Sequence, residues 1–117
     1  QKSELGFGIF GAYFFRIIIL AIILVGVLIF FAKDNPVNRL NIAQNLFEEK
    51  KYELSISQLE KIIENNPNWG KAYLLRGKVL SEYTGQDAGK DDLVKAWHFG
   101  DKNTKTEAIT LLPDPNN

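Results

Sequence analysis

The hydrophobic pattern divides this chain into two parts. From Leu5 to Ala32 almost every side chain is apolar, and Arg16 is the only charged one. A helix from Ala12 to Ala32 would rise about 31 Å, which matches a hydrocarbon core of roughly 30 Å. The pattern therefore predicts a single transmembrane helix, and we assign residues 1–34 to an N-terminal tail and this helix.

Three residues in the apolar run are candidates for helix packing. Gly8 and Ala12 are four residues apart, a spacing that lets a second helix approach closely. Arg16 can extend its guanidinium to the lipid headgroups, or it can pair with a carboxylate or lipid phosphate of a neighbouring subunit. The run has no His, Asp or Glu, so it offers no axial ligand to haem and no carboxylate to a proton relay. We expect the helix to anchor or to pack.

Beyond residue 34, apolar residues recur at the spacing of amphipathic helices. Asn35 and Pro36 are a favourable N-cap and first helical position. Asn-Asn-Pro at residues 65–67 ends a helix. Three helices are predicted in this stretch, from Pro36 to about Lys50, from Tyr52 to about Glu64 and from Trp69 to Tyr83.

The pattern loosens toward the C-terminus. Polar residues from Thr84 to Asp92 predict a loop, and Asp91 or Asp92 can cap a short helix that follows it. A last helix is predicted to begin at Thr104, because Glu107 stands at capping-box spacing from it. The expected fold class is all-α, with a transmembrane helix followed by a small helix-hairpin domain over residues 35–117.

Small and large residues of this domain fall at the places of a 34-residue unit counted from Pro36. Ala43 takes the small position of the first helix, and Pro67 takes the closing position. Leu46, Tyr52, Leu59 and Ile62 match further places, and the next unit, from Gly70, supplies Tyr73, Gly77 and Leu80.

On these residues the stretch resembles the tetratricopeptide repeat (TPR) family. Ser55 departs from the family pattern, because alanine is usual at its place on the second helix. The resemblance divides the domain into a first repeat, 35–68, and a degenerate second repeat with a capping helix, 69–112, which carries extra residues around Thr84 to Lys90.

The resemblance implies a concave surface that binds a peptide or protein. About two units are present, fewer than the three that an independent solenoid needs. Either Trp97 and Leu111 of the C-terminal helices cap the stack, or a partner covers its open face. The candidate protein-binding residues are Tyr52, Trp69, Tyr73, Arg76 and Tyr83.

Composition removes several function classes. Lys and Arg number 14 and Asp and Glu 14, so the net charge is zero, and no basic surface for nucleic acid is expected. There is no cysteine.

His98 and Asp101 could form a base and its orienting carboxylate, but a surface or capping histidine is the simpler interpretation. For Asp91 and Asp92, an N-cap is a simpler interpretation than a metal site. We expect no enzyme activity, no cofactor and no metal.

Two functions remain, both with protein subunits and the lipid bilayer as partners. The first is a membrane-anchored scaffold, assembly or docking protein that is accessory to a larger membrane complex. The second is a permanently bound structural subunit of a respiratory, photosynthetic or secretion complex. We expect a single-pass protein of a bacterial inner membrane or an equivalent energy-transducing membrane, with the side of the domain undetermined. Because the chain does not begin with Met, we expect it to be processed or to begin partway along its gene product.

Overall fold

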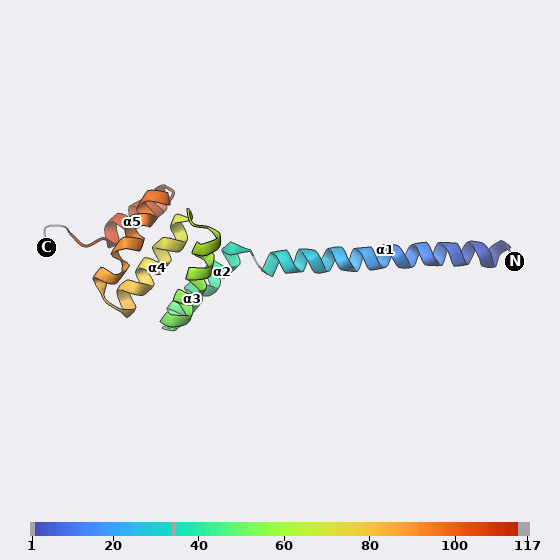
Figure 1. The fold of residues 1–117 in the computed structure, drawn as a ribbon, viewed down its shortest axis with the longest axis horizontal. Helices are drawn as coiled ribbons and strands as arrows, with labels where there is room; N and C mark the ends of the chain where they lie inside the picture. The colour runs from blue at the N-terminus through green and yellow to red at the C-terminus, as the bar shows by residue number, and fades with distance from the viewer. Residues whose placement is uncertain (1, 34, 115–117) are drawn as a thin grey trace. The chain divides into compact units, whose positions relative to one another are not determined.

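The computed structural model describes residues 2–33 and 35–114 (Figure 1). Within these residues the chain forms six α-helices, one short 3-10 helix and no strand, so the predicted all-α fold is confirmed. Packing divides the chain into two units, Gln1–Asn35 and Pro36–Asn117. Asp34, the predicted end of the first part, lies outside the described residues.

The first unit contains one helix, α1, which runs from Lys2 to Lys33. Its segment Gly8–Phe31 has 24 residues and a mean hydropathy of 3.0, and none of it is buried. A helix satisfies its own backbone hydrogen bonds, so an apolar helix of this length can cross a hydrocarbon layer. By length and composition α1 is thus able to span a membrane, a test that a signal sequence near the N-terminus or the core helix of a soluble protein also passes.

The second unit is a stack of helices in which each element packs against the next. The elements are α2 (Pro36–Glu48), α3 (Tyr52–Asn65), α4 (Gly70–Tyr83), the 3-10 helix η1 (Gln86–Gly89), α5 (Lys90–Phe99) and α6 (Lys102–Leu111). Helix α4 also contacts α2 and α6, so these three helices share one side of the stack. Figure 1 shows α2 to α5 side by side in chain order.

The two hairpins keep a common register of 34 residues. Helices α2 and α4 begin at Pro36 and Gly70, and α3 and α5 end at Asn65 and Phe99. The prediction of extra residues around Thr84 to Lys90 is therefore wrong. This segment forms η1, which occupies the place of the first turn of α3 and continues directly into α5.

Buried side chains form two clusters with α4 between them. The first cluster joins α2, α3 and α4, and the second joins α4, α5 and α6. Burial follows the 34-residue register, since Leu59 and Leu93 are both buried, as are Ile62 and Ala96. The clusters consist of Ala43, Leu59, Ile62, Ala72, Leu75 and Val79, and of Tyr73, Leu74, Leu93, Ala96 and Ala108.

Two of the predicted helix starts are wrong. Helix α5 begins at Lys90 without a side-chain cap, because η1 already leads into it, and Asp92 is buried instead. Helix α6 begins at Lys102, and its N-cap is Asp101, whose carboxylate accepts a hydrogen bond of 2.8 Å from the backbone N–H of Thr104. Aspartate is a strong N-cap, and its position leaves Thr104 buried inside the first turn.

Candidate functional site

Two pairs of neighbouring residues join the start of α3 to the end of α4. The hydroxyl of Tyr52 donates a hydrogen bond of 3.0 Å to Glu82, and the hydroxyl of Tyr83 donates one of 2.6 Å to Glu53. The sequence Tyr-Glu on α3 thus meets Glu-Tyr on α4 crosswise. These contacts hold the first hairpin to the second.

The two tyrosine rings stack with their centroids 5.4 Å apart, and Phe47 at the end of α2 lies 6.1 Å from Tyr52. We call Phe47, Tyr52 and Tyr83 the aromatic edge. The Tyr83 side chain remains 47% exposed, and the other two are half-buried. Partly exposed aromatic side chains of this kind are enriched at protein interfaces.

A lysine and the two carboxylates set the charge beside the aromatic edge. The ammonium of Lys50 lies 2.8 Å from Glu82. This hydrogen bond, with a second one from Tyr52, lowers the pKa of the Glu82 carboxyl, and the pKa of Lys50 is raised in turn by Glu82. The carboxylate of Glu53 raises the pKa of the Tyr83 hydroxyl that donates to it. Glu82 therefore stays ionised at neutral pH.

Lys50 has an unusual backbone, because its φ is +64°. This left-handed conformation favours glycine, since other side chains collide with the following carbonyl. The turn between α2 and α3 is closed by hydrogen bonds from the N–H of Lys50 to Phe47 and from that of Lys51 to Leu46, the pattern of a Schellman cap. The ion pair with Glu82 gives Lys50 a contact that glycine would lack.

A groove of about 370 Å³ lies next to the aromatic edge. Its apolar lining consists of Phe47, Leu93 and Leu111. We call the whole hollow, with its charged lining residues, the groove. Lys78 and Glu82 line it with charges of opposite sign, and Lys78 also pairs with Glu107. Phe47 belongs to both features, and Glu82 in the groove lining accepts the hydrogen bond from Tyr52, so the groove and the aromatic edge form one continuous surface.

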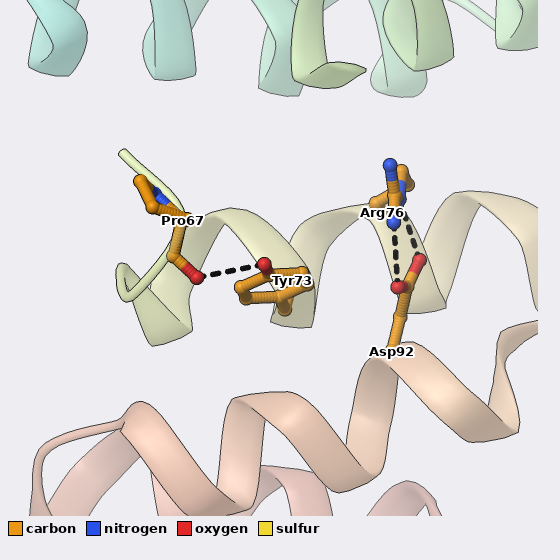
Figure 2. A network of polar contacts seen from close by, with 4 residues as sticks. All are labelled: Pro67, Tyr73, Arg76 and Asp92. Atoms are coloured by element: carbon orange, nitrogen blue, oxygen red, sulfur yellow. Dashed lines mark hydrogen bonds and ion pairs between the residues drawn. The ribbon is translucent and has the colours of Figure 1, made fainter. Parts of the chain in front are cut away.

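Two predicted binding residues belong to the interior. Tyr73 is only 5% exposed, and its hydroxyl donates a hydrogen bond of 2.7 Å to the carbonyl of Pro67. Arg76 donates two hydrogen bonds, of 2.7 and 2.8 Å, to the carboxylate of Asp92 on α5. Figure 2 shows these side chains on α4 turned toward their partners. Both residues stabilise the packing around α4 and offer little surface to a ligand.

The remaining predicted residues have mixed positions. Tyr52 and Tyr83 lie on the aromatic edge, whereas Trp69 is half-buried against the first core cluster at the start of α4. Gly8, Ala12 and Arg16 lie in α1 at exposed positions, and a side chain added at Gly8 would meet open space. Sequence reasoning did not find the groove, because its lining comes from five separate elements.

The suggested base and carboxylate have other roles. Asp101 is the N-cap of α6, and the backbone N–H of Thr104 lowers the pKa of its carboxyl. His98 is exposed in the last turn of α5, and its ring lies 4.8 Å from that of Phe99. Over residues 2–33 and 35–114, no three His, Cys, Asp or Glu side chains are placed to hold a metal ion.

A comparison with protein-family models, curated proteins and solved structures found no match to this chain. Function must therefore be argued from the surface itself. An apolar groove bordered by an aromatic edge and by charges of both signs has the chemistry of a protein-binding surface. It can take an apolar side chain in its centre and polar contacts at its rim.

Proposed function

We propose that this protein is a membrane-anchored docking protein that binds another subunit of a membrane complex through the groove and the aromatic edge. The observation that carries the proposal is the continuity of these two features on one surface of the helical unit. Binding surfaces with an apolar centre and an aromatic contribution supply most of their affinity from a few such residues.

The anchor in this proposal is α1. None of Gly8–Phe31 is buried, so in water its apolar side chains would all stay solvated. Burial of apolar surface gains about 25 cal/mol per Å², which makes a lipid environment strongly favourable for this segment. An anchored protein also meets membrane partners at a raised local concentration, without any added contact.

The TPR-like assignment belongs to the same proposal. The common register of the two hairpins supports it, because repeat units of this kind stack with a constant period. The departure at Ser55 has a physical explanation. Its side chain is buried and its hydroxyl donates a hydrogen bond of 2.7 Å to the carbonyl of Ala43, so a polar atom at the helix crossing is satisfied.

The partner segment that fits is an amphipathic helix or extended peptide. One large apolar side chain would enter between Phe47, Leu93 and Leu111, and polar groups beside it would reach Lys78 and Glu82. Lys78 is already paired with Glu107 and Glu82 with Lys50, so the segment needs polar groups that can share these ion pairs and no large net charge.

The test compares two substitutions in the full chain in its native membrane. Leu111→Lys places a charge in the groove, and Ile42→Lys makes the same change at a 49% exposed position on α2. We expect Leu111→Lys to lower co-purification of an integral membrane partner about tenfold, as for an interface hot spot. Equal retention by both variants would contradict docking in the groove.

A further inference from the structure

The surface between α5 and α6 is apolar where the stack of helices ends. Val94 is 47% exposed, Trp97 45% and Ile109 56%. Val94 and Ile109 line a cavity of about 970 Å³ together with Leu112. We call Val94, Trp97, Ile109 and Leu112 the α5–α6 face.

The 34-residue register shows that two of these four positions have covered equivalents elsewhere in the molecule. Ile109 stands 34 residues after Leu75, which is buried in the first core cluster. Trp97 stands 34 residues after Ile63, which is half-buried against both clusters. A stack of helical repeats stays soluble when its terminal helix has a polar outer face. On the α5–α6 face, polar side chains such as Gln86 and Lys90 lie around an apolar centre, and this centre is suited to being covered.

Charges lie at opposite ends of this face. Asp87 lines the cavity beside Leu112, where the start of α5 meets the end of α6. Lys105 lies at the other end, with its ammonium 5.7 Å from the centre of the Trp97 ring. Lys90 also lines the cavity near Asp87. The cavity end therefore has two carboxylates, Asp87 and Asp114, and one lysine, Lys90, which leaves it net negative. Lys105 lies at the other end, and apolar side chains lie between the two ends.

We propose that the α5–α6 face binds the same face of a second copy of this chain across a two-fold axis. In such an interface each contact occurs twice, so a face must be complementary to itself. A two-fold axis near Val94 and Ile109 would turn the second copy end over end. Lys105 of each copy then lies against Asp87 of the other, while the apolar residues are covered. The groove, with Phe47 and Leu111, stays available for another partner.

The absence of cysteine in the natural chain makes single-cysteine cross-linking a direct test. The full chain would be reconstituted in lipid vesicles at low density, with Val94→Cys or Ile109→Cys and a short bismaleimide. Ile42→Cys, at 49% exposure on α2, is the matched control. We expect covalent dimers from the first two variants and few from the control. Equal yields at all three positions, or dimers from the control alone, would overturn the proposal.

A charge exchange tests the two-fold arrangement and guards against loss of folding. In the Ile109→Cys background, Lys105→Asp is expected to lower the dimer yield about tenfold. The two-fold interface contains the Lys105–Asp87 pair twice, and the substitution removes both copies of it. Adding Asp87→Lys should restore the yield. Failure of the double variant to recover would overturn the proposed pairing. Leu111→Lys should leave the dimer intact, so failure of the docking function and failure of this proposal can be told apart.

Discussion

The two hairpins share one register but cross in different ways. In the first, Ala43 faces Ser55, and the serine hydroxyl bonds to the Ala43 carbonyl. In the second, the equivalent positions are Gly77 and Gly89, and a Cβ on Gly89 would lie only 2.1 Å from the Gly77 carbonyl oxygen. One crossing is held by a side chain, and the other by direct backbone approach. The same helix geometry thus tolerates two chemistries, with different sensitivity to substitution.

The largest effect is expected at the backbone crossing. Gly89→Ala would place a methyl group against the Gly77 carbonyl and 2.2 Å from the Ser81 hydroxyl. We expect the helical unit to lose about 3 kcal/mol of unfolding free energy, because backbone cannot move aside as a flexible side chain does. Urea unfolding of the full chain in detergent, followed by tryptophan fluorescence, measures this loss.

The matched control for this substitution is Ala88→Ser, an exposed neighbour in η1. We expect its unfolding free energy to stay within about 0.5 kcal/mol of the natural chain. A similar stability for both variants would contradict the close crossing of the second hairpin.

The second effect concerns the ion pair of Arg76 and Asp92. At the equivalent positions the first hairpin has Ile42 and Gln58. Asp92→Gln alone leaves a half-buried guanidinium without its carboxylate, and we expect a loss of about 2 kcal/mol. The double variant Arg76→Ile, Asp92→Gln copies the first hairpin and should lose only about 1 kcal/mol, since no charge is left unpaired.

The same urea unfolding measurement gives the result. Both variants lack the ion pair, so a double variant less stable than Asp92→Gln alone would mean that Arg76 without its carboxylate stabilises the helical unit more than isoleucine does. That outcome would contradict the equivalence of the two hairpins at these positions.

Local signals in the sequence were enough to locate most helices. Pro36 begins α2 as predicted, Tyr52 begins α3, and Tyr83 ends α4. The sequence predicts the end of α2 at about Lys50, two residues too late, because the helix propensity of lysine does not indicate the left-handed conformation that Lys50 adopts.

The contacts between helices could not be predicted in the same way. Arg76 meets Asp92 across 16 residues, and Tyr52 meets Glu82 across 30. No local spacing rule connects residues that are this far apart, since their approach depends on how the helices cross. The same holds for the groove, in which Phe47 and Leu111 meet only through packing on both sides of α4.

A smaller effect is expected at the serine crossing. Ser55→Ala removes the hydrogen bond to Ala43 and introduces alanine, the residue usual at this place in the TPR family that the sequence resembles. We expect a loss of about 1 kcal/mol, the net value of one buried hydrogen bond. Ser57→Ala, at an exposed position of the same helix, is the control. Identical unfolding curves for the two variants would show that the hydroxyl contributes nothing to the crossing.

The smallest effect is a pH dependence of the contact between the hairpins. The pKa of Glu82 is lowered from its ordinary value of 4.5, mainly by Lys50. This contribution to stability is complete above the unfolded pKa and is lost as the pH falls below 4.5 through the folded pKa. Both side chains are exposed, so the change is small.

The difference in urea midpoint between the natural chain and Glu82→Gln should therefore shrink as the buffer is taken from about pH 6 to about pH 3. A difference that stays constant over this range would contradict the ion pair.

We propose that α1 lies in a bilayer while the helical unit lies in water, and the docking function depends on this placement. Spin labels on single cysteines at Leu24 in α1 and Ile42 in α2, in the full chain in lipid vesicles, test it most directly. We expect the Leu24 label to collide with oxygen and to be shielded from a water-soluble nickel chelate, and the Ile42 label to show the opposite. Equal access of the nickel chelate to both labels would contradict the claim.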